Sequence, residues 1–308
     1  MHATIRPIFL IIAMVLLASP ALADSFGLGV AGDFNTFVFN DFSGSSDTEG
    51  RLAVGGNAHL EHYSVGDKLQ PGAGDVLVVG GDLTYTGGRV YNGDIRVGGA
   101  ANLPGYDLTH EGDTHVGVGL PFSFAAEQSR LTALSQTLAQ TGATGSSSYQ
   151  WGTITLAGNG STTQVFNLDG QQLLDANNIT FSGIADGATV VVNVSGNNAG
   201  FTNMGMQGFD TIRENVIFNF HEATDLLIAG VGVQGSILAP NAHVDAQGGV
   251  IWGTTVASSW NGPVQQNNAP FTGNLPNNPV PIPGAAWLLG SALMGLAGMR
   301  VLRSRQRI

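Results

Sequence analysis

The chain has no cysteine among its 308 residues. Disulfide scaffolds, zinc–thiolate sites and thiol nucleophiles are therefore excluded. Charged residues are also scarce, at 11% against roughly 25% in ordinary soluble domains. The sequence contains neither a Gly-x-Ser-x-Gly nucleophile elbow nor a phosphate-binding Gly-x-x-x-x-Gly-Lys loop. These absences favour a protein that is not an enzyme, needs no cofactor, and is held together by its core and backbone hydrogen bonds.

Basic residues are nearly missing from the middle of the chain. Of the 11 basic residues, Arg6 and four arginines near the C-terminus lie at the two ends, while all 22 acidic residues lie between Asp24 and Asp245. The middle is therefore strongly acidic, which disfavours binding to nucleic acid and to anionic lipid. We expect no nucleic-acid partner. We interpret the acidic charge as a means of keeping the protein soluble. The alternative is that the charge recruits cations.

Glycine is abundant, with 45 residues, and 43% of the chain is apolar. Three related segments lie in its first half: residues 52–57 (LAVGGN), 77–82 (LVVGGD) and 95–100 (IRVGGA). Each reads as a short strand closed by a Gly-Gly turn, where glycine supplies positive φ. Such repetition predicts a mainly β protein, a right-handed β-helix or solenoid whose rungs share one core. A β-sandwich with similar turns is the alternative.

Residues 122–140 differ from this pattern. Ser123 can cap a helix, no Gly or Pro interrupts the segment, and Leu131, Leu134 and Leu138 follow helical spacing. We predict one amphipathic helix packed along a face of the solenoid. A Gly/Ser/Thr connector follows at 141–148, and closely spaced strands then resume as further rungs up to residue 262. Residues 263–279 are rich in Pro, Asn and Gly, and we predict an extended tether there.

The N-terminal residues 1–23 have the form of a signal peptide. Arg6 precedes an apolar run of ten residues, too short to span a bilayer, and Pro20 follows it. Ala21 and Ala23 stand where signal peptidase reads small side chains, so we expect cleavage before Asp24. An N-terminal membrane anchor is the alternative.

The C-terminal residues 280–308 have three parts. A Pro-x-Pro motif comes first, an uncharged apolar segment follows, and a basic cluster ends the chain. The motif is Val280, Pro281, Ile282 and Pro283; the basic cluster is Arg300, Arg303, Arg305 and Arg307. The apolar segment predicts a short transmembrane helix at about 284–302, with its basic flank in the cytoplasm. The folded body would then lie outside the inner membrane.

This tail resembles the PEP-CTERM sorting signal of Gram-negative bacteria, in its Val-Pro-x-Pro form. Ile282 stands where that form usually has Leu. The resemblance implies processing near the Pro motif by an exosortase, with the inner membrane as a transient stage. The expected destination is the cell surface or the extracellular matrix. An ordinary C-terminal membrane anchor is the alternative.

The body resembles the choice-of-anchor A family of bacterial surface domains. The resemblance rests on residues 37–57 (FVFNDFSGSSDTEGRLAVGGN), 75–83 (DVLVVGGDL) and 232–242 (GVQGSILAPNA), and we place the domain at 24–262. It implies an adhesin or surface-layer component without established catalytic activity. Rungs beside one helix also resemble the ice-binding-like β-solenoid, a similarity of fold that does not transfer function.

Few residues are candidates for metal binding. Asp41, Asp47 and Glu49 surround a Gly-Ser-Ser loop, where oxygen ligands could hold calcium. The alternative is that Asp47 and Glu49 cap a turn and pair with Arg51. Residues 110–115 (HEGDTH) have one residue too many between the histidines for a zinc-binding helix, which leaves only a loop metal site.

Binding surfaces are the remaining hypotheses. Thr-x-Thr occurs at 84–86 and 153–155, which is too sparse for an ice-ordering ladder. Trp151, Trp252 and Trp260 could stack on sugar rings, although packing is the commoner role. We therefore expect a non-enzymatic adhesin or matrix component with an extracellular polysaccharide or protein ligand. The alternatives are a glycan-, calcium- or ice-binding module, and last a polysaccharide-active enzyme.

Overall fold

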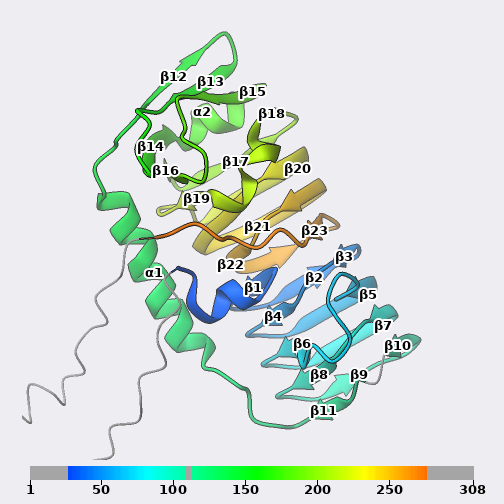
Figure 1. Ribbon diagram of the computed structural model, residues 1–308. Coiled ribbons are helices and arrows are strands. Elements are labelled where there is room, and N and C mark those ends of the chain that lie inside the picture. Colours follow the sequence, from blue (N-terminus) through cyan, green and yellow to red (C-terminus); the bar gives the residue numbers. More distant parts are fainter. Residues whose placement is uncertain (1–26, 109–111, 276–308) are drawn as a thin grey trace, which may run out of the picture.

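The computed structural model describes residues 27–108 and 112–275. Short β-strands stack side by side into a long solenoid, and one helix runs along its flank (Figure 1). Within the described residues, every strand pair is parallel except β12 (Ser146–Gln150) with β13 (Thr153–Ala157), which form an antiparallel hairpin. The solenoid expected from the repeats is confirmed, and its handedness stays a prediction.

The strands form three faces. The helix-covered face consists, in spatial order, of β14 (Thr163–Asp169), β16 (Thr189–Ser195), β19 (Val216–Phe220), the first parts of β21 (Ser236–Trp252) and β22 (Thr255–Asn261), β1 (Thr36–Val38), β4 (Leu52–Val54), β6 (Asp75–Val79), β8 (Asp94–Val97) and β11 (Thr114–Val116).

The open face is the second. It consists of β17 (Asn198–Thr202), the first part of β20 (Asp225–Gln234), the middle of β21, the end of β22, β2 (Phe42–Gly44), the first parts of β5 (Ala58–Val65) and β7 (Leu83–Val90), and β9 (Ala101–Asn102). A short helix, α2 (Gly170–Asp175), packs against β17 at one end of this face.

The hairpin face is the third. It consists of β12, β13, β15 (Asn178–Ser182), β18 (Gly205–Gln207), the ends of β20 and β21, β23 (Gln265–Asn267), β3 (Asp47–Thr48), the ends of β5 and β7, and β10 (Tyr106–Leu108). The described part of the chain also has three short 3₁₀ helices outside these faces. One (Gly29–Asp33) precedes β1, and two (Phe209–Thr211 and Arg213–Asn215) lie between β18 and β19.

The chain does not climb the solenoid in one direction. Strands β1 to β11 build one half, starting from the middle of the molecule. Helix α1 (Phe124–Gln140) then returns along the helix-covered face to the far end (Figure 1). Strands β12 to β23 build the second half back to the middle, where β22 pairs with β1 and β2, and β23 with β3. We call this contact between the halves the seam.

Helix α1 forms as predicted, beginning two residues later. Ser123 caps it, because its side chain accepts a hydrogen bond from the N–H of Ala126. Leu131, Leu134 and Leu138 are buried against outward-facing residues of the helix-covered face. Those residues come from eight strands: Val165, Val191, Ile217, Leu238, Val256, Phe37, Ala53 and Val78. Without the helix, this apolar row would face water.

The Gly-Gly pairs occur at corners as predicted, but the reason given for them was wrong. Gly55, Gly80 and Gly98 do not have positive φ. A Cβ atom at Gly80 would overlap the carbonyl oxygen of Gly55, and one at Gly98 would overlap that of Gly80. The pairs are needed because the backbones of adjacent rungs approach closely there, which only glycine allows.

Two segments predicted as irregular are ordered parts of the body. Residues 146–148 belong to β12, not to a flexible connector. Residues 263–275 are not an extended tether: β23 pairs with β21 and β3, and Leu275 is buried against the helix-covered face. Gly and Pro content suggested a linker, but backbone pairing to neighbouring rungs holds the segment in place.

The two ends of the chain bear on membrane association. In the part that the structure describes, no helix is long and apolar enough to cross a membrane. The predicted signal peptide, the sorting motif and the span at 284–302 lie outside the described residues.

Candidate functional site

The open face carries polar side chains from several rungs at the same level. In a strand, alternate residues point to opposite sides, so Val244 and Trp260 point into the core while His243, Asp245 and Asn261 point outward. Parallel register aligns these side chains between strands. Asp225 lies opposite His243, and Asp245 lies opposite Asn261. Rungs about 4.8 Å apart thus present a continuous polar surface.

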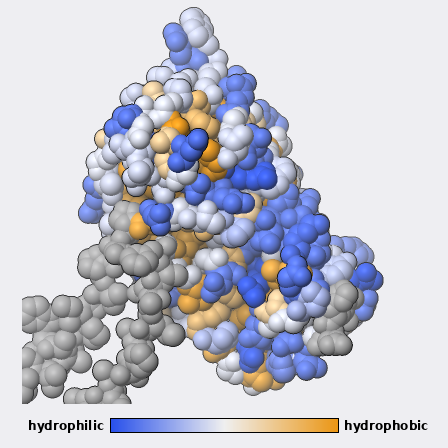
Figure 2. All heavy atoms as spheres, viewed as in Figure 1, coloured by the Kyte–Doolittle hydropathy of each residue, from blue (hydrophilic) through white to orange (hydrophobic). Residues whose placement is uncertain are grey.

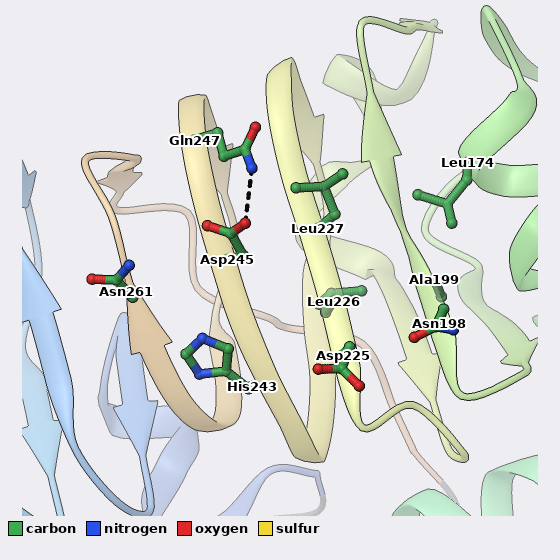
Figure 3. Close-up of a pocket in the computed structure, with 10 residues that line it drawn as sticks. All are labelled: Leu174, Asn198, Ala199, Asp225, Leu226, Leu227, His243, Asp245, Gln247 and Asn261. Atoms are coloured by element: carbon green, nitrogen blue, oxygen red, sulfur yellow. Dashed lines mark hydrogen bonds between the residues drawn. The ribbon is translucent and has the colours of Figure 1, made fainter.

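Two adjoining hollows lie on this face. The first, of about 600 Å³, is bounded by β17, β20, β21 and β22, with Leu174 of α2 at its edge (Figure 3). The second, of about 680 Å³, lies over β2, the start of β5 and the start of β7. His243 lines both hollows. Together they make an open strip that crosses the seam and joins the two halves of the solenoid.

Hydrogen bonds fix several side chains of the strip. In the first hollow, Gln247 Nε2 donates to Asp245 Oδ2 at 2.8 Å (Figure 3). Between the hollows, His243 Nδ1 and Ser259 Oγ lie 2.8 Å apart. These contacts orient the groups before any ligand arrives, which lowers the ordering cost of binding.

In the second hollow, polar side chains form a ladder along the corner of the solenoid. The backbone N–H of Asn57 donates to Asp41, that of Asp82 donates to Asn57, and that of Ala100 donates to Asp82. The donor–acceptor distances are 2.8, 2.9 and 2.8 Å. Each side chain thus accepts one backbone hydrogen bond, and its other polar atom is available on the surface.

The strip is acidic and polar. Four aspartates line it, and no Lys or Arg is among the described residues that border either hollow. The aspartates are Asp41, Asp82, Asp225 and Asp245. Amides, hydroxyls and two imidazoles lie between them, and the partly exposed Leu174 and Leu227 add apolar surface to the first hollow. Such a surface repels polyanions and can exchange hydrogen bonds with neutral hydroxyl groups.

The predicted calcium ligands are not brought together. Asp41 lies in the corner ladder, whereas Asp47 and Glu49 lie on the hairpin face near the seam, where Glu49 accepts the backbone N–H of Asn268 at 2.8 Å. Burial raises the pKa of Asp47, and a hydrogen bond from Ser46 partly opposes that effect. Among the described residues, no group of three His, Asp or Glu side chains is placed to hold a metal ion.

The alternative to calcium binding, a pairing of Asp47 and Glu49 with Arg51, is also not found among the described residues. Arg51 donates instead to the carbonyl oxygens of Asp33 and Ala73. Of the HEGDTH segment, His110 and Glu111 lie outside the described residues, and His115 Nε2 lies 3.8 Å from Asp94 Oδ2.

A regular threonine plane is not present on the open face. Thr84 belongs to a cross-rung row whose other members are Gly200, Leu227, Asp245, Asn261, Ser43, His59 and Asn102. On the hairpin face, Thr155 pairs with Thr180 and the row then continues to Gln207. The side chains along each row therefore differ in size and charge, unlike a repeating ice-ordering array.

The three tryptophans have different environments. Trp260 is buried and stacks on Phe42, with ring centroids 6.0 Å apart. Trp252 is partly buried, and the Arg213 guanidinium lies over its ring. Trp151, in contrast, is 92% exposed at the turn of the β12–β13 hairpin.

Sequence reasoning did not find the strip. Residues 243–246 (HVDA) lie among the closely spaced strands expected up to residue 262, and strand alternation already places His243 and Asp245 on one side. The Asx residues that follow Gly55-Gly56 and Gly80-Gly81 were a second signal. What joins these segments is the seam, which no local pattern encodes. The processing residues Ala21, Ala23, 280–283 and the four tail arginines lie outside the described residues.

Taken together, the fold and the strip define a β-solenoid protein with one helix-covered face and one polar, open face. Residues 27–268 match the model of the family described as "Putative Ice-binding-like adhesive domain". The chain belongs to that family.

Comparisons with individual proteins gave distant matches. An ice-binding protein from an Antarctic biological consortium is 13% identical with a TM-score of 0.38, over 79% of this chain and 87% of that chain. An ice-binding protein from the Antarctic ascomycete Antarctomyces psychrotrophicus is 14% identical with a TM-score of 0.37, over 79% of this chain and 98% of that chain. No protein in the curated set matches the sequence significantly.

Proposed function

We propose that this protein is an exported, non-enzymatic adhesin that binds a hydroxyl-rich extracellular polysaccharide through its open face. The observation that carries the proposal is the strip of two adjoining hollows, lined by carboxylates, amides and imidazoles and by no Lys or Arg among the described residues. These groups donate to and accept from sugar hydroxyls. The acidic charge favours neutral or cationic polymers over polyanions.

A binding role fits this surface better than catalysis. The strip is an open surface, and its aspartates are already engaged: Asp41 and Asp82 accept backbone N–H groups, and Asp245 accepts from Gln247. A hydrolase needs an acid and a second carboxylate that converge on one bond from opposite sides. Family membership in an adhesive domain supports the same conclusion.

The experiment measures binding of the purified protein to immobilised neutral, cationic and anionic polysaccharides: dextran, chitosan and alginate. We expect binding to dextran or chitosan, and little to alginate. Asp245→Asn should weaken that binding by about tenfold, since one hydrogen bond to a charged acceptor is worth roughly 1.5–3 kcal/mol. Asp186→Asn, at an exposed loop, is the matched control and should bind normally.

Two results would contradict the proposal. One is binding that Asp245→Asn leaves unchanged. The other is inhibition of ice recrystallisation that Asp245→Asn abolishes while polysaccharide binding is absent, which would assign the open face to ice instead.

The route to the surface is part of the proposal. We propose that signal peptidase removes residues 1–23, and that residues 280–308 act as a PEP-CTERM-like tail, giving a transient inner-membrane intermediate before exosortase processing. The choice-of-anchor A resemblance supports this arrangement. Deleting 280–308 should turn an envelope-associated protein into a freely secreted or unstable one, as fractionation and immunoblotting would show. Unchanged localisation and size would refute the sorting role.

A further inference from the structure

The β12–β13 hairpin carries the most exposed large apolar side chain among the described residues. Trp151 is 92% exposed, and its neighbour along the strand, Tyr149, is 39% exposed. The hairpin belongs to the end of the solenoid farthest from β11, and its tip projects from the body (Figures 1 and 2). Within the described part of the chain, the Trp151 ring has no aromatic, cation–π or hydrogen-bond partner.

Trp151 also occupies an unfavourable backbone position. Its φ is +53°, and that of Gly152 is +76°, so both residues of the two-residue turn are left-handed. Such hairpin turns favour Asn-Gly, because Asn tolerates the left-handed region and a bulky side chain does not. Trp151 therefore destabilises the fold in two ways, by exposing apolar area to water and by its strained backbone. No packing contact of its ring with the described residues offsets either effect. Strain and exposure at one site indicate a role in binding.

The surroundings of the ring indicate the ligand. Asn177 lies beside the turn, because its backbone N–H donates to the carbonyl oxygen of Gly152 at 2.7 Å. The Asn177 side chain is exposed. Gln150 precedes Trp151 in the chain and is exposed, and the remaining hairpin strand residues facing solvent are mainly serines and threonines. No Lys or Arg lies in β12, β13 or their turn, and Tyr149 is already tied to the Asp175 carbonyl at 3.2 Å.

We propose that Trp151 is the stacking platform of a second binding site, which takes a pyranose ring of an uncharged saccharide. The flat indole face accepts the C–H side of the ring, and the amides of Gln150 and Asn177 reach its hydroxyls. A membrane surface would need basic residues and a wider apolar face. A protein interface would need further apolar anchors around the tryptophan. This site stands independently of the open face.

The test uses the full-length protein and its Trp151→Asn variant. Asn creates the favoured Asn-Gly turn, so the variant should fold with an unchanged or higher Tm. Cellohexaose, chitohexaose and mannohexaose are titrated while tryptophan fluorescence is recorded, and the difference between wild type and variant isolates the Trp151 signal. For at least one hexasaccharide we expect a saturable shift in wild type, and an affinity at least about tenfold weaker in the variant by calorimetry.

Two further variants sharpen the result. Trp151→Tyr keeps an aromatic face and should retain part of the affinity. Asp245→Asn alters only the open face and should keep the Trp151 fluorescence change, so failure of this site and failure of the open-face site give different outcomes.

Three results would overturn the proposal. The first is the absence of any Trp151-dependent fluorescence change with all three hexasaccharides. The second is wild-type binding to vesicles of phosphatidylcholine and phosphatidylglycerol that Trp151→Asn abolishes. The third is self-association of wild type, seen by sedimentation, that the variant loses.

Discussion

The two halves of the solenoid hold their rungs together with different side-chain ladders. In the first half, β1 to β11, the ladder runs along a corner: Asp41, Asn57 and Asp82 each accept a backbone N–H from the next rung. The glycine pairs let those backbones approach closely. This ladder is exposed, and it forms part of the second hollow of the strip.

In the second half, β12 to β23, the ladder lies on the helix-covered face beneath α1. Asn219 Nδ2 donates to Asn193 Oδ1 at 2.9 Å, and Asn193 Nδ2 donates to Asn167 Oδ1 at 3.4 Å. The same amides bind the helix: Asn219 Nδ2 donates to the Ser135 carbonyl, and Asn193 Nδ2 to the Leu138 carbonyl, both at 2.8 Å. Ser135 Oγ donates back to Asn219 Oδ1 at 2.6 Å.

The exposed ladder of the first half only joins adjacent rungs. The buried ladder of the second half joins adjacent rungs and also holds helix α1 in place. An exposed hydrogen bond can be replaced by water, whereas a buried amide that loses its partner cannot be. The second half should therefore tolerate changes to its ladder less well than the first half tolerates changes to its own.

Removal of the buried amide has the largest expected effect. Asn219→Ala would remove the acceptor of the Ser135 hydroxyl and the donor to Asn193 Oδ1, and should lower the free energy of unfolding by about 2–4 kcal/mol. For a chain of this size, this corresponds to a Tm loss of roughly 3–6 °C. Thermal unfolding followed by circular dichroism measures it.

Asn167→Ala is the matched control for that change. Asn167 stands at the exposed end of the same ladder, and its removal should cost less than about 1 kcal/mol. Equal losses for the two variants would show that burial does not distinguish the members of the ladder.

The glycine corner has the next largest expected effect. Gly80→Ala places a Cβ atom against the carbonyl oxygen of Gly55, so the rungs must shift apart. We expect a loss of about 1–3 kcal/mol, as for other overpacked sites. Gly119→Ala is the control, since a Cβ there meets nothing within 4 Å. A Gly80→Ala variant with the Tm of the control would mean that the corner is not close-packed in solution.

The two ladders also show what the sequence could and could not reveal. The Gly-Gly repeats were visible because each lies in one continuous segment, so rungs and solenoid followed. The asparagine ladder had a signal that was missed: 166–168 (FNL), 192–194 (VNV) and 218–220 (FNF) repeat an apolar–Asn–apolar pattern at equal intervals. A buried Asn in such a strand needs an outside partner, which points to the helix.

The strip on the open face could not be predicted in the same way. It depends on β22 pairing with β1 and β2, residues separated by nearly the whole described chain. No periodicity links such segments, because the chain leaves the seam and returns to it by way of α1. The exposure of Trp151 was equally hidden, since the hairpin was predicted in part as a connector.

The smallest expected effect concerns the seam. Asp47 of β3 lies there, and burial, with smaller contributions from the charges of Asp67 and Glu49, raises its pKa above the ordinary 3.8. The native state therefore binds its proton more tightly than the unfolded chain does. Stability should fall as pH rises from below 3.8 through the raised pKa, and should then remain lower by a constant amount.

Asp47→Asn should remove that fall, because the amide keeps the acceptor for Ser46 and cannot ionise. Above the raised pKa the variant should be slightly more stable than the wild type, and below 3.8 the two should coincide. Tm measured from pH 3 to pH 7 shows the difference, with Asp186→Asn as the exposed control. A wild type and variant with parallel Tm curves would mean that the seam at Asp47 is as open to water as the loop at Asp186.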